Sequence, residues 1–120
     1  ISGGSLGQGL PIGVGMALAL RHKQSKAFVY NSMSDGELDE GSTWEAAMSA
    51  AHHGLGNLIC LVDINNQQAD GPSSSVLGFE PLADKWLALA GTCSASMATT
   101  WPPCWPPSTP RATSKTPSRA

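Results

Sequence analysis

"NLICLVDINNQQADG", residues 57–71, begins as a run of branched apolar side chains and ends in amides, an acid and a glycine. A continuous apolar run that is bounded by turn residues is typical of a strand buried in a parallel sheet. The amides, Asp70 and Gly71 that follow have the chemistry of a turn. The stretch therefore predicts a buried parallel strand over residues 57–64, with a polar loop directly after it.

The segments around this strand alternate in type. Their patterns give the order helix, strand, helix, strand, helix, over residues 2–23, 26–30, 42–53, 57–64 and 81–90. The first of these opens as a glycine-rich turn, and in the second helix Ser42 and Glu45 have the spacing of a capping box. Alternation of this kind predicts an α/β fold in which a parallel sheet has helices on both faces.

Composition excludes several classes of partner. The chain has 120 residues and a net charge of −2, with 41% apolar and 13% charged residues. This balance offers no basic surface to nucleic acid or to a membrane. The longest apolar stretch, residues 10–20, contains Pro11 and two glycines and is too short to span a bilayer. We therefore expect a globular domain that binds neither nucleic acid nor membrane.

Three cysteines, Cys60, Cys93 and Cys104, show neither a paired framework nor metal-ligand spacing. Cys60 lies within the apolar run, which indicates a buried free thiol in a reducing compartment. No signal peptide is visible, and we expect a cytoplasmic protein. The chain opens at Ile1 without a methionine, so we expect it to be the middle of a longer gene product.

The composition changes abruptly near Gly91. Every Asp and Glu lies at or before Asp84, and six of the nine prolines follow Trp101. The later segment has no helical or strand period, which is typical of disorder. We expect residues 1–90 to form the folded part and residues 91–120 to be a disordered tail.

"SDGELDEGSTWEAAM", residues 34–48, contains five of the nine acidic side chains. A calcium loop is one interpretation, but its frame requires glycine and glutamate where this chain has Glu40 and Ala46. Dinucleotide and P-loop patterns fail at their later positions as well. The remaining simple interpretation is that Asp35, Glu37 and Asp39 favour the positive start of a helix and stay solvated.

A second loop favours a more specific site. Asp35 follows one predicted strand and Asn65 follows the next, and parallel strands end at the same edge of a sheet, where ligands bind. One carboxylate, one amide oxygen and a main-chain carbonyl suit Mg²⁺ that a diphosphate also holds. Gly36 lets the main chain approach phosphate closely. The pattern predicts a magnesium diphosphate site at this edge.

These segments resemble a known family. "SDGELDEG" with "VDINNQQADGP" is similar to the thiamine-diphosphate signature, and "GSLGQGLPIGVGMALALR" and "EGSTWEAAMSAAHHGLGNL" are similar to the N-terminal, diphosphate-binding domain of transketolases. The resemblance covers roughly residues 3–90. It implies the thiamine-diphosphate-binding fold, present here as an incomplete domain or subunit.

The resemblance also implies roles for single residues. Asp35, the Asn65 side chain and the Gln67 carbonyl would bind Mg²⁺. Gly36 and Asn65 would meet the cofactor's diphosphate, and the loop that passes beside its rings would consist of Gly4, Ser5 and Leu6. No catalytic residue is expected in this chain. Ser34 departs from the family signature, which has glycine there.

Further residues keep two interpretations. The resemblance places Glu40 in a carboxylate network that links cofactor sites, and Glu45 is either in that network or a helix cap. Glu37 and Asp39 are expected to be solvated. Trp44 and Trp86 are expected to pack, with Trp44 also a candidate for a subunit interface.

As for function, the resemblance implies transfer of a two-carbon ketol unit between sugar phosphates in the pentose phosphate pathway, with thiamine diphosphate and Mg²⁺. A second, pyrimidine-binding domain or subunit would complete an oligomeric enzyme, so the isolated chain is expected to be inactive. The alternatives are deoxyxylulose-phosphate synthase, pyruvate dehydrogenase E1, or an inactive truncated remnant.

The sequence of residues 91–120 suggests why no acidic residue follows Asp84. Transketolase-like chains continue with a pattern close to Trp-His-Val, then Asp-Gly-His-Asp-Leu-Ala-Ala-Leu. When the reading frame is shifted by one base, the codons of Met97-Ala98 must encode glycine and those of Trp101-Pro102 alanine. In the same frame Cys104-Trp105 must encode leucine and Trp105-Pro106 alanine. The intervening codons can encode the rest of that string. We therefore hypothesise a one-base frameshift near Ala90.

The coding DNA tests this hypothesis directly. We expect its alternative frame beyond Ala90 to read Asp-Gly-His-Asp-Leu-Ala-Ala-Leu in the codons of residues 96–104, because the forced codons already match. A sequence read through this region, repeated on an independent clone to exclude a reading error, makes the measurement. Any other string in that frame rejects the frameshift.

Overall fold

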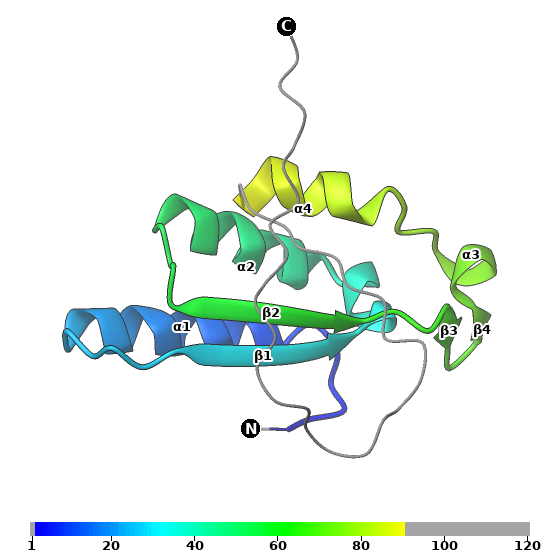
Figure 1. Cartoon of the computed structure of the whole chain (residues 1–120). Coiled ribbons are helices and arrows are strands. Elements are labelled where there is room, and N and C mark those ends of the chain that lie inside the picture. The colour runs from blue at the N-terminus through cyan, green and yellow to red at the C-terminus, as the bar shows by residue number, and fades with distance from the viewer. Residues whose placement is uncertain (1, 91–120) are drawn as a thin grey trace, which may run out of the picture.

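The computed structural model describes residues 2–90. The elements in chain order are α1 (Gly9–His22), β1 (Val29–Ser34), the 3₁₀ turn η1 (Asp35–Asp39), α2 (Gly41–His52), β2 (Leu58–Asp63), β3 (Gln67–Gln68), β4 (Gly71–Pro72), α3 (Ser73–Val76) and α4 (Leu82–Ala90). Figure 1 shows β1 and β2 side by side, with α1 packed against them, α2 next to α1, and α4 next to α2. The small β3–β4 hairpin lies where the two strands end. The predicted alternation of helices and strands is confirmed.

Strands β1 and β2 form a parallel pair. The register runs from Val29 opposite Leu58 to Ser34 opposite Asp63, so both strands end at the same edge. The hairpin β3–β4 is antiparallel and forms a separate two-stranded sheet. Because the register leaves no overhang, the segments that follow β1 and β2 must start next to each other. The predicted parallel pairing is therefore confirmed.

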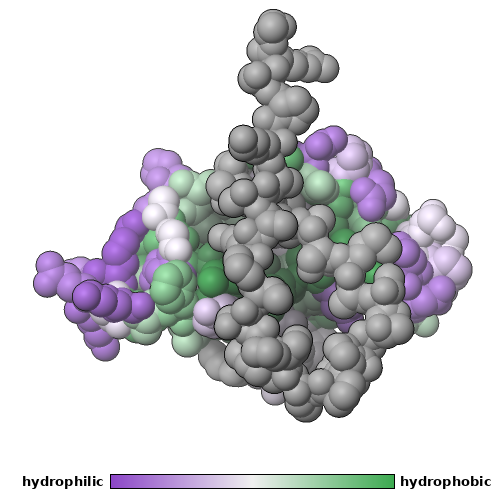
Figure 2. All heavy atoms as spheres, in the orientation of Figure 1, coloured by the Kyte–Doolittle hydropathy of each residue, from purple (hydrophilic) through white to green (hydrophobic). Residues whose placement is uncertain are grey.

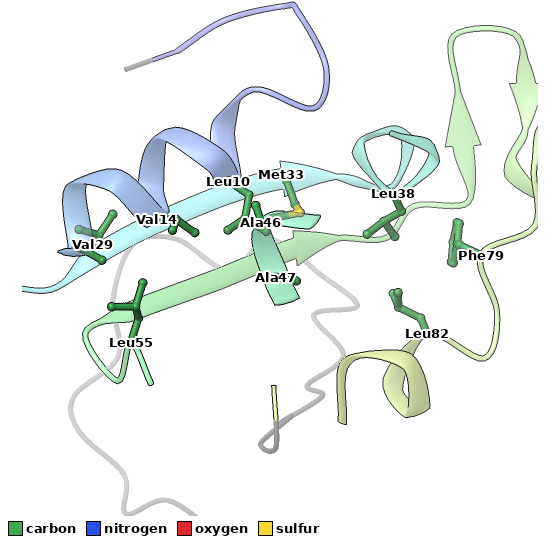
Figure 3. Packing of buried hydrophobic residues seen from close by; sticks show 11 residues of the cluster. Leu10, Val14, Val29, Met33, Leu38, Ala46, Ala47, Leu55, Phe79 and Leu82 are labelled. Carbon is green, nitrogen blue, oxygen red and sulfur yellow. The ribbon is translucent and has the colours of Figure 1, made fainter. Parts of the chain in front are cut away.

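One face of the β1–β2 pair carries the core. Side chains of β1 alternate between buried and exposed, as a half-covered strand should. Gly13 of α1 lies so close to this face that an added Cβ would be 3.4 Å from Leu58 Cδ1. Figure 3 shows the cluster extending from α1 and the strands to η1 and α4, where Leu38, Phe79 and Leu82 lie. Its buried members are Leu10, Val14, Ala17, Val29, Met33, Leu38, Ala46, Ala47, Leu55, Phe79 and Leu82.

The opposite face of the pair is open within residues 2–90. Tyr30 and Leu61 on that face are 67% and 54% exposed. Figure 2 shows apolar surface over the middle of the molecule and polar surface toward both of its sides. The α/β class is confirmed, and the sheet is incomplete, since the described helices cover one face only.

Three local predictions differ from the structure. The strand over residues 57–64 was expected to be buried, but the side chains of β2 are half-buried or exposed among residues 2–90, because one face of the strand pair is open. The first strand was expected over residues 26–30, but β1 starts at Val29 and continues through Ser34, because Asn31 faces the core and keeps the alternation. The capping box of Ser42 and Glu45 is wrong, since no side chain caps α2. Ser42 lies inside the first turn instead, where its hydroxyl serves a tertiary contact described below.

Cys60 is a free, half-buried thiol, as predicted. Burial raises the pKa of this thiol to about 11, which leaves it protonated and unreactive near neutral pH. The other two cysteines and the whole expected tail, residues 91–120, lie outside the described residues. In residues 2–90 no helix has the length and apolar character needed to cross a membrane.

Candidate functional site

The end of β1 runs directly into η1, and η1 lies against the loop that follows β2. Asp35, the first residue of η1, is 1% exposed, so a carboxylate is enclosed at the edge of the sheet. The hairpin strand β3 contacts η1 from the other side. Figure 1 shows this junction where β1 and β2 end, beside β3 and α3. The structure thus brings the acidic turn η1 and the polar loop after β2 together, as their positions after parallel strands predict.

Two hydrogen bonds hold the Asp35 carboxylate. Its Oδ1 accepts the Gly36 N–H at 3.0 Å, and its Oδ2 accepts the Ser73 hydroxyl at 2.8 Å. Ser73 is itself 2% exposed, and its N–H donates to the Asn66 carbonyl at 3.1 Å. A buried carboxylate needs such donors because removing its charge from water is costly. Ser73 therefore joins the acidic turn to the loop after β2.

The predicted ligands in that loop are placed differently from Asp35. Asn65 and Gln67 are exposed, and the Asn65 Oδ1 accepts the Gln67 N–H at 2.9 Å, as in an Asx turn. Asn66 between them has φ of 60°. Among the described residues, the side-chain donor to Asp35 is Ser73, the first residue of α3, and neither Asn65 nor Gln67 donates to it. The three predicted ligands thus belong to one junction, with Asp35 enclosed and the other two at its surface.

The predicted cofactor-binding residues fall into two groups. An added Cβ at Gly36 would lie 3.7 Å from Leu6 Cδ1 and 4.0 Å from the Gln68 Cδ. Leu6, Gly36 and the second loop therefore meet. Gly4 and Ser5 are exposed, and nothing lies within 4 Å of a Cβ added at Gly4. Gln68 was not predicted; its Nε2 is buried and has no hydrogen-bond partner among residues 2–90.

The acidic turn also holds the glycine-rich loop before α1. The Gly7 N–H donates to Glu37 Oε2, and the Ser42 hydroxyl donates to the Gly7 carbonyl at 2.7 Å. The interpretation of Glu37 as solvated is wrong, because its carboxylate is half-buried and accepts this bond. Asp39 is not simply solvated either, since its Oδ1 is buried without a partner in the described part of the chain. No local pattern in residues 34–48 marks these tertiary contacts.

Oxygen donors at the junction fit a magnesium ion only in part. Within residues 2–90, no three His, Cys, Asp or Glu side chains gather as metal ligands. The predicted set contains a single carboxylate, an amide and a carbonyl, so any Mg²⁺ there must take further oxygens from a ligand or water.

Comparison with known proteins agrees with this geometry. A family model described as transketolase, thiamine diphosphate binding domain, matches residues 1–90. The chain is 67% identical over 88 residues to a putative uncharacterized transketolase family protein of Sinorhizobium fredii, covering 73% of this chain and 32% of that protein. It is 47% identical over 85 residues to one subunit of an apulose-4-phosphate transketolase of Actinobacillus succinogenes, covering 71% and 31%.

The chain belongs to the transketolase family. A crystal structure of transketolase from Campylobacter jejuni matches with a TM-score of 0.70 and 31% identity, over 75% of this chain and 15% of that one. Both the resemblance and the incomplete thiamine-diphosphate-binding fold are thereby confirmed. The chain spans about a third of the length of the curated relatives it matches, 32% and 31% for the two above.

Trp44 and Trp86 of this transketolase-family chain are packing residues, as expected. Trp44 and Trp86 contact each other with ring centroids 5.4 Å apart, and both lie against the core. The Trp44 Nε1 donates to the Leu38 carbonyl at 2.8 Å, which fixes the end of η1. Glu40 and Glu45 are both exposed, and the helix-cap interpretation of Glu45 is wrong because α2 has no side-chain cap.

Gly7 is the residue that lets the glycine-rich loop dock. Its φ is 77°, and an added Cβ would lie 2.4 Å from Ser42 Oγ and 2.9 Å from Glu40 Cβ. Side chains are strained in this conformation, and neither neighbour is free to move without losing its own contacts. The close approach therefore demands glycine.

We expect Gly7→Ala to lower the free energy of unfolding by about 2 kcal/mol or more, from left-handed strain and steric overlap. Chemical denaturation followed by circular dichroism measures the change. The matched control is Gly15→Ala in α1, where nothing lies within 4 Å of an added Cβ; helix propensity should make it neutral or stabilising by up to about 1 kcal/mol. Equal stability of the two variants would contradict the docking described here.

Proposed function

We propose that this chain provides the diphosphate and Mg²⁺ half of a thiamine-diphosphate-dependent transketolase. The observation that supports the proposal is the enclosed carboxylate of Asp35 at the shared end of β1 and β2, next to Gly36, which has no side chain. An acidic group is rarely enclosed unless something pairs with it. Membership of the transketolase family, in the domain described as thiamine diphosphate binding, supports the same site.

In this proposal Asp35, the Asn65 side chain and the Gln67 carbonyl hold Mg²⁺. All three are oxygen donors, the ligand type that Mg²⁺ takes in proteins, and the ion usually keeps waters and substrate phosphates as its other ligands. The Asn65 amide is exposed and held only by its local turn, so it is accessible to an ion. Gly36 meets the diphosphate, since it has no side chain of its own to keep phosphate away from its main chain.

The glycine-rich loop of Gly4, Ser5 and Leu6 passes beside the cofactor's rings. Its exposure leaves that surface available, and the contacts of Gly7 with Glu37 and Ser42 fix the loop next to the diphosphate site. When bound, thiamine diphosphate supplies the carbanion chemistry of two-carbon transfer. The residues of this chain bind and orient the cofactor, and no catalytic residue is assigned to it.

The remainder of the enzyme lies in a second domain or subunit. The relative from Actinobacillus succinogenes is named as one subunit of an apulose-4-phosphate transketolase, which supports a divided, oligomeric enzyme that acts on sugar phosphates. The exposed Tyr30 and Leu61 face is a surface on which further protein would pack. Without that partner the chain transfers no ketol unit. The free Cys60 thiol supports a cytoplasmic location. We also propose a role in the pentose phosphate pathway.

Removal of a ligand tests the site. We expect Asp35→Ala and Asn65→Ala to weaken thiamine diphosphate binding in Mg²⁺ by roughly 100-fold, because phosphate charge is left uncompensated. Isothermal titration calorimetry on the full chain measures the affinity. The control Asp84→Ala removes the same charge from the exposed side of α4 and should bind normally. No Mg²⁺-dependent binding by the unsubstituted chain, or equal affinity in all variants, would reject the site.

Gly36 provides an independent test. A methyl group fits there in ordinary contact, with its nearest neighbour 3.7 Å away, so Gly36→Ala should unfold at nearly the same temperature as the unsubstituted chain. The methyl would occupy the approach to the diphosphate, and we expect about tenfold weaker binding or worse by the same calorimetry. Gly41→Ala is the control, because nothing lies within 4 Å of a Cβ added there. Full affinity in Gly36→Ala would show that the diphosphate does not lie against this residue.

A further inference from the structure

We infer that Ser73 is a positioning residue, whose hydroxyl holds the Asp35 carboxylate in the orientation that binds the metal. The inference rests on the proposed function, since it assumes that Asp35 is a ligand. Ser73 Oγ donates to Asp35 Oδ2 at 2.8 Å, across 38 positions of sequence, in a fully buried contact. No feature of the sequence singles out this serine, which is the first of three in a row.

The bond fixes the rotation of the carboxylate. Gly36 N–H binds one carboxylate oxygen and Ser73 binds the other, so the two oxygens cannot exchange places without breaking a bond. An ionised carboxylate accepts about four hydrogen bonds or ligands. Acceptor positions therefore remain on both oxygens after these two bonds. Ser73 leaves the carboxylate both oriented and able to accept a cation.

The main chain of Ser73 acts on the other two ligands. Its N–H donates to the Asn66 carbonyl at 3.1 Å, and Asn66 lies between Asn65 and Gln67. Asn66 has φ of 60°, a conformation that needs support from its surroundings. One residue thus ties both halves of the site: its hydroxyl holds the first ligand, and its backbone holds the turn that carries the second and third.

Such outer contacts matter because a metal site binds tightly only when its ligands are already in place. A purely structural role is the competing explanation, in which Ser73 does no more than satisfy a buried charge. The two explanations differ in what Ser73→Ala changes. Loss of positioning weakens metal binding in the folded protein, whereas loss of a structural bond lowers stability and leaves the affinity of the folded protein unchanged.

The experiment measures Mn²⁺ binding by electron paramagnetic resonance, with thiamine diphosphate present, on the full chain. We expect Ser73→Ala to weaken Mn²⁺ binding about tenfold, within the range for loss of an outer contact, and to broaden the bound spectrum as the ligand geometry becomes less uniform. Ser73→Thr, which keeps the hydroxyl, should recover most of the affinity. Ser74→Ala is the matched control, because Ser74 is exposed and one position away.

Further variants separate the possible outcomes. Where Ser73→Ala does not fold, Ser73→Cys replaces the hydroxyl with a somewhat larger thiol that is a weaker donor. It should bind Mn²⁺ more weakly than the unsubstituted chain at temperatures where both are folded. If Asp35→Ala weakens binding while Ser73→Ala and Ser73→Cys bind normally, the positioning role is rejected and the proposed function stands. If Asp35→Ala itself binds Mn²⁺ normally, the proposed function fails, and this inference fails with it.

Discussion

The parallel register of β1 and β2 places every part of the candidate site. Because Ser34 lies opposite Asp63, the turns that follow the two strands start at one edge and cannot avoid each other. The helix α2 that joins the strands packs on the same face as α1, and this single layer buries the core. A shift of the register by one residue would turn Asn31 and Met33 away from that core. The site therefore owes its position to the same alternation that holds the domain together.

The acidic side chains of Asp35 and Glu37, just after β1, accept hydrogen bonds from the main chain. Glu37 accepts from Gly7 and Asp35 accepts from Gly36, so each carboxylate satisfies a backbone donor in a region without a regular ladder. Two of the five acidic residues in residues 34–48 are used in this way. The negative charge of these two carboxylates is thereby held in a fixed position.

Docking of the glycine-rich loop joins the start of the chain to this frame. Gly7 approaches Ser42 and Glu40 more closely than any side chain permits, and Leu6 is thereby brought beside Gly36. Segments thirty or more positions apart thus form one surface, with the exposed loop on one side and the Asn65 turn on the other. The two hydrogen bonds of Gly7 join the Glu37 carboxylate and the Ser42 hydroxyl to main-chain atoms.

Local patterns in the chain were enough to establish the class of fold, the order of its elements and the family. Periodicity in residues 42–53 reports the buried face of α2, and the apolar run before Asn65 identifies β2 as a strand, although its side chains are only half-buried or exposed among residues 2–90. The signature around Asp35 provided the predicted ligands. The roles of Glu37, Ser42 and Ser73 emerged from the packed structure alone, because each bonds a partner 30 to 38 positions away. A serine in a polar loop has the same local pattern whether it faces water or a buried carboxylate, and the packing of the strands determines which of the two it meets.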